Sequence, residues 1–147
     1  MKIDIVAEDA LGREVLIALI QEAFLSDQEA TSLLADLRLV HLPARYGLIG
    51  DLAKIRIADF EHPVDSVFTC ELKAAEILRR YDNDFGSKIF SRRYLRVLVE
   101  SWLRDIAFHW DSEKPPALDL LSEIGLAQAL KGGDTRSEVV IETDSVR

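Results

Sequence analysis

The chain has 147 residues, an apolar fraction of 48% and a formal net charge of −8 at pH 7. This length and composition predict one packed globular domain and exclude a disordered chain. The acidic balance disfavours sequence-independent nucleic-acid binding, which needs many cations to neutralise phosphates, and the single cysteine excludes a disulfide framework.

The N-terminal sequence favours a cytoplasmic protein. Asp4 places an acid where a signal peptide would have its apolar stretch. The longest apolar run, residues 15–20, is far shorter than the roughly 20 residues that a membrane span needs. We therefore expect no membrane contact, and we expect no cofactor and no metal because no known binding motif for either occurs.

The first elements are predicted from local patterns. Residues 2–6 alternate between apolar and polar and predict a short strand. Apolar residues at helical spacing predict a core helix over residues 8–24. Residues 26–29 read S-D-Q-E, a capping box in which the serine and the glutamate each accept from the other's backbone N–H. This box predicts a second helix that continues through Leu37 and is stopped by Pro43.

The middle of the chain is the hardest part to interpret. Gly47 and Gly50 indicate a turn, and the following A-K-I-R-I-A-D-F fits either a strand or a short helix. We favour a helix because the neighbouring segments are predicted to be helical. A further helix is expected over residues 63–81, since proline suits the first turn of a helix.

The strongest pattern lies in the second half of the chain. A helix is predicted from Ser87 or Ser91 to Trp110, with one continuous apolar arc formed by Leu95, Leu98, Val99, Trp102, Ile106 and Trp110. A last helix should turn Leu118, Leu121 and Ile124 inward and close at Gly132 and Gly133.

These elements predict an all-α fold, a compact bundle of five to six helices. Residues 1–133 would form this single helical domain. The acidic C-terminal tail, residues 134–147, contains E-V-V-I-E-T and would either pair with residues 2–6 as a short strand or stay loosely attached.

Positive charge is concentrated in the middle of the chain. Residues 71–104 carry 8 Lys/Arg against 5 Asp/Glu, while residues 1–70 carry 6 against 12 and residues 105–147 carry 4 against 9. The candidate partner-binding residues are Lys88, Arg92, Arg93 and Arg96. A basic helix face between acidic ends favours electrostatic recognition of another protein over nucleic acid. For these four residues, a solvated helix face is nevertheless the favoured interpretation, and partner binding is the alternative.

Residues 104–109 read R-D-I-A-F-H, the arginine-x4-histidine pattern of the HEPN family. That family consists of all-helical domains and includes metal-independent ribonucleases. The resemblance implies His109 as the acid/base group, Arg104 as the phosphate-holding group and Asp105 as the polar residue that follows the arginine. On a continuous helix, however, five residues correspond to about 140° around the axis, so the two side chains would diverge.

Two functions therefore remain after the sequence analysis. The favoured one is a non-catalytic, acidic, helical protein-binding module: an adaptor, inhibitor, immunity or regulatory protein. The alternative is a HEPN-like ribonuclease, acting as a homodimer. A ligand pocket lined by Trp102, Phe108 and Trp110 is a third interpretation, although tryptophans on an apolar arc are more often part of a core.

Overall fold

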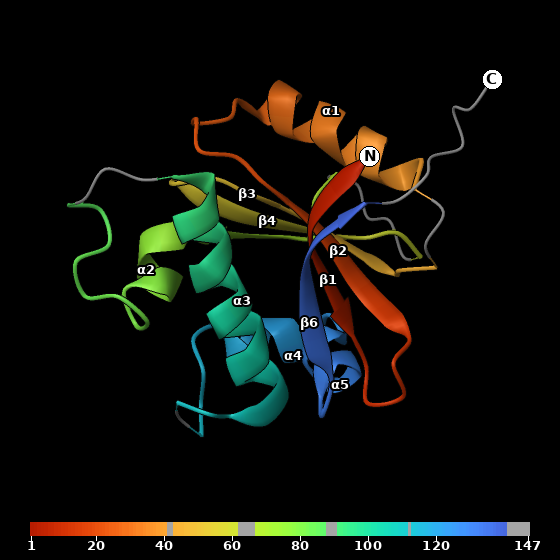
Figure 1. The fold of residues 1–147 in the computed structure, drawn as a ribbon, viewed down its shortest axis with the longest axis vertical. Helices are drawn as coiled ribbons and strands as arrows, with labels where there is room; N and C mark the ends of the chain where they lie inside the picture. The colour runs from red at the N-terminus through yellow and green to blue at the C-terminus, as the bar shows by residue number, and fades with distance from the viewer. Residues whose placement is uncertain (41–42, 62–66, 88–90, 112, 141–147) are drawn as a thin grey trace.

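A six-stranded sheet forms the centre of the molecule, with helices on both faces (Figure 1). The computed structural model describes residues 1–40, 43–61, 67–87, 91–111 and 113–140. The strands are β1 (Lys2–Glu8), β2 (Glu14–Ile20), β3 (Tyr46–Gly50), β4 (Lys54–Asp59), β5 (Cys70–Lys73) and β6 (Asp134–Val140). The helices are α1 (Asp27–Arg38), α2 (Ala74–Leu78), α3 (Arg92–Phe108), α4 (Leu118–Glu123) and α5 (Leu126–Leu130). The protein is therefore mixed α/β, and the expected all-α bundle is wrong.

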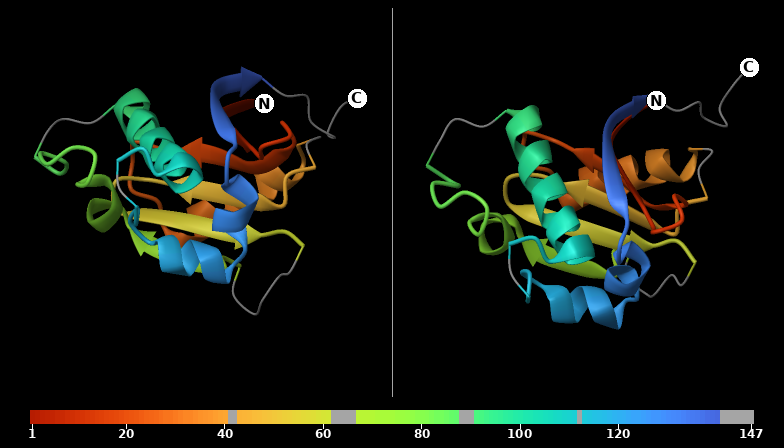
Figure 2. Two further views of the ribbon diagram at one scale, coloured as in Figure 1. Left: turned by 90° about the horizontal axis from the view of Figure 1, so that it is seen from below. Right: turned by 60° about the horizontal axis from the view of Figure 1, so that its bottom comes forward.

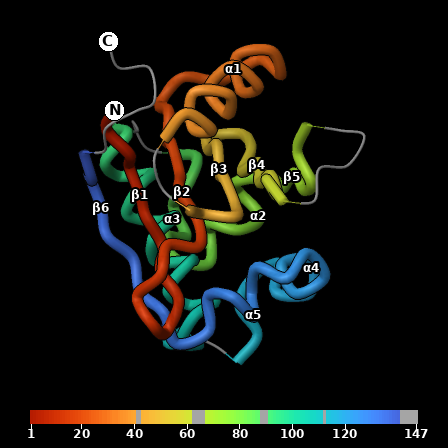
Figure 3. Tube along the Cα trace, turned by 90° about the vertical axis from the view of Figure 1, so that its right-hand side faces the viewer, coloured from red at the N-terminus to blue at the C-terminus, as the bar shows by residue number. Residues whose placement is uncertain are grey.

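The strands follow the order β5-β4-β3-β2-β1-β6. Neighbouring strands are antiparallel except β2 and β3, which run parallel and are joined through α1. Parallel neighbours need such a crossover connection. β1 and β6 place Lys2 opposite Val140, so the N-terminus and the end of β6 lie side by side (Figure 3). Residues 134–140 are thus an edge strand of the sheet, and residues 141–147 lie outside the described residues.

The helix expected over residues 8–24 is wrong, because the middle of this segment is the strand β2. This strand reads E-V-L-I-A-L-I and is buried along nearly its whole length. Leu16 and Ile20 pack on one face of the sheet, whereas Ile17 and Leu19 pack on the other. A central strand that is buried on both faces is a continuous apolar run, and periodicity alone does not distinguish it from a core helix.

The middle segment is a strand pair. Residues 46–50 and 54–59 form β3 and β4, so the favoured short helix is wrong and the strand interpretation of A-K-I-R-I-A-D-F is right. Gly47 lies within β3 and marks no turn; a Cβ there would lie 2.5 Å from the ring of Phe60, so the close approach of this ring requires glycine. The expected helix over residues 63–81 is also wrong, since its described part contains β5 before the short α2.

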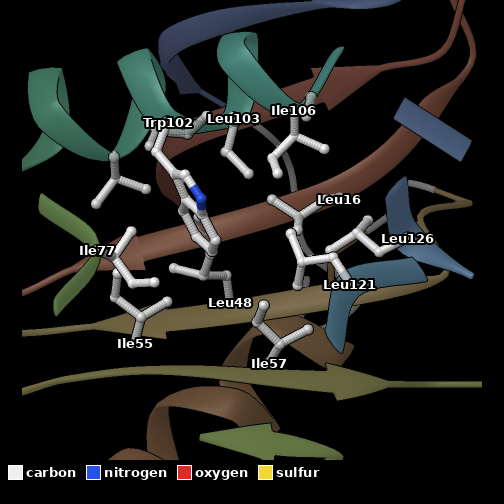
Figure 4. Close-up of a cluster of buried hydrophobic side chains, with 14 of the residues drawn as sticks. Leu16, Leu48, Ile55, Ile57, Ile77, Trp102, Leu103, Ile106, Leu121 and Leu126 are labelled. Atoms are coloured by element: carbon white, nitrogen blue, oxygen red, sulfur yellow. The ribbon is translucent and has the colours of Figure 1, made fainter. Parts of the chain in front are cut away.

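Apolar clusters fill both faces of the sheet. The larger cluster lies between the sheet and helices α2 to α5 (Figure 4). Figure 2 shows the arrangement of these helices around the sheet. Trp102 is its largest fully buried side chain, and the indole N–H donates to the Pro116 carbonyl at 2.9 Å. The smaller cluster lies between the sheet and α1, which buries Leu34 and Leu37. Helices that follow the 3.6-residue period thus cover strands that are apolar on both faces.

Two helix predictions are confirmed, with adjusted ends. α1 begins after Ser26 with both hydrogen bonds of the capping box formed. α3 begins after Ser91, whose hydroxyl accepts from the Tyr94 N–H, and ends at Phe108. The expected last helix is divided into α4 and α5 at Gly125, where φ is +84°. Among the described residues, no helix combines the length and the apolarity that a bilayer crossing requires.

Candidate recognition surface at the end of helix α3

Helix α3 is continuous over its 17 residues, from Arg92 to Phe108. The predicted inner residues Leu95, Leu98, Val99, Trp102 and Ile106 are all buried. The helix ends because His109 adopts the left-handed conformation, with φ 55° and ψ 42°, while its N–H donates to the Asp105 carbonyl. This reversal turns the chain away from the helix axis. The break that would let residues 104 and 109 converge is therefore absent from α3.

Arg104 and His109 contact different parts of the molecule. The Arg104 guanidinium lies 3.4 Å from Asp134 of β6 and 3.5 Å from Glu100. The His109 Nδ1 lies 2.7 Å from the Glu113 carbonyl oxygen. The structure does not bring this pair together within one protomer. Moreover, the HEPN resemblance implies an all-helical domain, which the six-stranded sheet contradicts.

Asp105, the third residue of the pattern, is fully buried. Its carboxylate accepts from the Tyr81 hydroxyl at 2.7 Å and from the Asp111 backbone N–H at 3.0 Å. Burial, followed by the hydrogen bond to Asp105, raises the pKa of Tyr81 well above its usual range, so the phenol stays protonated and remains a donor. Asp105 thus ties the end of α3 to Tyr81 and to the following turn. Its position on the helix, about 20° from Leu98 at the edge of the apolar arc, was a signal for such an anchor.

Two aromatic side chains project from this anchored turn. Phe108 is 55% exposed and Trp110 is 54% exposed. The Trp110 indole N–H donates to the Ser101 carbonyl at 2.9 Å, so the ring folds back along the outer side of α3. Its centroid lies 5.7 Å from that of the Tyr81 ring. The expectation that Trp110 points into the core is wrong, because α3 ends two residues before it.

We call Val97, Ser101, Phe108 and Trp110 the aromatic surface. Val97, Ser101 and Phe108 lie within an arc of about 40° on α3, and Val97 is also among the exposed apolar side chains. The ion pair between Arg80 and Asp111, with Nε and Oδ2 2.5 Å apart, borders this surface next to Trp110. The proposed pocket of Trp102, Phe108 and Trp110 is not formed, since Trp102 is in the core and the other two face solvent.

The basic residues of α3 are largely paired within the chain. Arg96 is buried and lies 2.8 Å from Glu138 of β6 and 3.6 Å from Glu100. The Arg92 guanidinium lies 3.6 Å from Asp4 of β1. Buried Glu100 also accepts from the Thr135 hydroxyl at 3.0 Å. The basic middle and the acidic C-terminal part of the sequence therefore neutralise each other across α3 and the sheet edge.

Arg93 and Lys88 are the other two predicted partner-binding residues, and only Arg93 is among the described residues. Arg93 is exposed and forms no ion pair with the residues that the structure describes. Lys88 lies outside the described residues. Of the four predicted residues, Arg93 alone is described as a cation without an ion-pair partner.

A buried ion pair on the opposite face was missed by the sequence analysis. Arg56 of β4 is buried beside Asp51, with Nη1 and Oδ2 3.3 Å apart, and it also donates to the Leu25 carbonyl at 3.2 Å. Asp51 additionally accepts from three backbone N–H groups, at Leu25, Ala53 and Lys54. The pair fixes the connection before α1 to the sheet. An arginine within the apolar alternation of β4 was the available signal.

No catalytic or metal constellation stands out in the described part of the chain. It contains no group of three or more histidine, cysteine or acidic side chains placed to hold a metal. Burial raises the pKa of the Cys70 thiol, which disfavours the reactive thiolate. His41 and His62, the other histidines, lie outside the described residues.

Comparisons with family models, with curated proteins and with solved structures find no match to this chain. The likeness to the HEPN pattern therefore rests on residues 104–109 alone.

Proposed function

We propose that this protein is a non-catalytic protein-binding module that contacts its partner through the aromatic surface. The observation that carries the proposal is the position of Trp110: its ring is half exposed and yet fixed by hydrogen bonding to Ser101 and by contact with Tyr81. A tryptophan held in one place loses little conformational freedom on binding. Tryptophan, tyrosine and arginine are also the residues most enriched among those that dominate protein interfaces.

The setting of this residue supports the same function. Phe108 presents a second aromatic ring within three residues, and the apolar Val97 extends the surface along α3. Single exposed apolar side chains need no explanation, but a group held on a rigid element is typical of an interaction site. Arg80 and Asp111 supply a charged rim of the kind that surrounds an interface centre. The complementary partner surface is an apolar pocket with polar edges.

The roles compatible with this proposal are those of an adaptor, an inhibitor, an immunity protein or a regulatory protein. Each of them requires a stable surface and no chemistry at the site. The acidic net charge of −8 disfavours nucleic acid as the partner. A protein partner is therefore preferred.

Site-specific photocrosslinking tests the proposal directly. A photoreactive phenylalanine analogue at position 108 should give a discrete adduct with a heterologous protein in the cells that produce this chain. The same analogue at Leu11, an exposed residue in the β1–β2 connection, serves as the control and should not. Trp110→Ala should abolish the adduct at 108 while the circular dichroism spectrum stays that of the folded protein.

Equal adducts at both positions, or none at 108, would contradict the proposal. An adduct of twice the mass of the chain would show that the partner is a second copy of this chain, which would contradict a heterologous partner.

A nuclease assay addresses the ribonuclease alternative. We expect RNA to stay intact when it is incubated with purified protein in EDTA. Cleavage that persists without metal and disappears in His109→Ala would overturn the non-catalytic proposal.

A further inference from the structure

A groove runs beside the first turns of α1, on the opposite face of the sheet from α3. Its volume is about 420 Å³, and it is lined by Gln21, Leu25, Gln28, Glu29, Ser32 and Leu33. We call it the α1 groove. Leu25 and Leu33 are only partly buried and pack against the apolar cluster under α1, so their remaining surface is available in the groove. The neighbouring Phe24 is 70% exposed.

The rim of the α1 groove is acidic and is not neutralised within the described chain. Residues 14–37 contain five Asp/Glu and no Lys/Arg. Among the described residues, Glu29 and Asp36 of α1 form no ion pair, whereas three arginines of α3 have carboxylate partners at 2.8 to 3.6 Å. Glu22 belongs to the side of α3, because its carboxylate accepts from the Arg92 backbone N–H at 3.3 Å. The excess negative charge of the molecule therefore has a defined location on and before α1.

The chemistry of Glu29 keeps this charge in place. Its carboxylate accepts from the Ser26 backbone N–H at 2.9 Å, and this hydrogen bond lowers the pKa of Glu29. The side chain is thus ionised at neutral pH and is held on the groove wall. Asp27, which is mostly exposed, lies 3.9 Å from the Arg56 guanidinium.

We infer that the α1 groove binds a cationic amphipathic segment of a partner protein. An apolar side chain of the segment would fill the space between Leu25 and Leu33, while its lysines or arginines face Glu29 and Asp36. Charge complementarity selects a cationic occupant and steers it to this face. The apolar lining selects a segment that has apolar residues on one side. The inference uses none of the residues of the aromatic surface, so either proposal can fail without the other.

A synthetic peptide provides the probe. It has about 14 residues, with leucines at helical spacing and lysines elsewhere. Two related peptides act as comparisons, one with glutamate in place of lysine and one with serine in place of leucine. Amide chemical shifts of the isotopically labelled full chain report the binding site, and a titration gives the affinity. We expect shifts at Gln21, Leu25, Gln28 and Leu33 with the leucine–lysine peptide only.

Two matched variants separate the groove from the overall charge. The first combines Glu29→Gln with Asp36→Asn, and the glutamine introduced at position 29 still completes the capping box. The control combines Glu76→Gln with Asp84→Asn, which changes the net charge equally at sites outside the groove. We expect about tenfold or more weaker peptide binding in the first variant and less than about twofold in the control.

Equal weakening in both variants would show that the peptide senses the total charge, which would overturn the inference. Equal binding of the serine–lysine peptide would overturn it as well, because the apolar lining would then contribute nothing.

Discussion

Replacing Asp105 tests whether this buried carboxylate anchors the aromatic surface. In the native protein, the Asp105 carboxylate accepts from the Tyr81 hydroxyl at 2.7 Å and from the Asp111 N–H at 3.0 Å. Both donors lose this charged acceptor in Asp105→Ala. Hydrogen bonds to charged groups contribute about 1.5–3 kcal/mol each. Removal of a buried charge offsets part of that loss. We therefore expect the free energy of unfolding to fall by about 3–5 kcal/mol, a large share of the roughly 5–15 kcal/mol typical of a domain.

The isosteric replacement gives a different result if the role of Asp105 is positional. In Asp105→Asn the amide oxygen can accept from the Asp111 N–H, and the amide nitrogen can donate to the Tyr81 hydroxyl oxygen. Neutral hydrogen bonds then replace the charge-assisted ones, and we expect a loss of about 1–2 kcal/mol. The asparagine variant should also leave Trp110 in place, since the turn that carries it remains tied to α3.

Urea unfolding, followed by circular dichroism, measures both free energies. The indole N–H resonances of the two tryptophans supply the second measurement. In Asp105→Ala, the Trp110 resonance should move toward its position in an unfolded chain and exchange faster with solvent, while that of the buried Trp102 stays. The anchoring role of Asp105 is refuted if Asp105→Ala changes the unfolding free energy by less than about 0.5 kcal/mol. It is also refuted if the Trp110 resonance is unaffected in a destabilised variant.

Three further predictions concern the rest of the molecule. Arg56→Met leaves Asp51 buried without its cation and should lower the free energy of unfolding by about 3–5 kcal/mol in urea; a loss below about 1 kcal/mol would contradict a structural role for this pair. The charges of Lys2 and Arg96 lower the pKa of Glu138, so the stability it contributes is present above about pH 4.5 and is lost as the pH falls through the lowered pKa. Glu138→Gln should therefore flatten the pH dependence of the urea midpoint in this range. The effect is disproved if the urea midpoints of the variant and the native protein change in parallel with pH. Because burial raises the pKa of the Cys70 thiol, iodoacetamide should alkylate it about tenfold or more slowly in the folded protein than in urea at the same neutral pH; equal rates would show an accessible thiolate.

The parts of the fold that follow from neighbouring residues were predictable. Ser26 and Glu29 satisfy each other's backbone groups within one turn, so the start of α1 follows from four residues. The apolar arc of α3 from Leu95 to Ile106 covers about three turns, which leaves no other regular structure with the same spacing. Strand β1 also follows from its alternation.

The strands of the sheet interior could not be identified in the same way. In β2, residues 15–20 are apolar without interruption, because one side chain in two faces α1 and the next faces α3. The hydrogen bonds that make this segment a strand come from β1 and β3, and β3 lies some thirty residues further along the chain. The local pattern is the same for a core helix, so tertiary pairing decided the outcome.

The candidate surface divides along the same line. The sequence alone predicted the long helix and its inner face. It also drew attention to the cluster of charged and aromatic residues at the end of this helix. The tertiary structure alone decided that Arg96 is used internally by Glu138, that Asp105 meets Tyr81, and that Trp110 faces solvent. Each of these contacts joins residues far apart in the chain, or depends on the left-handed turn at His109, for which no glycine gave a signal. Local propensity fixes an element within a few turns, whereas burial and charge pairing depend on which elements come to lie against one another.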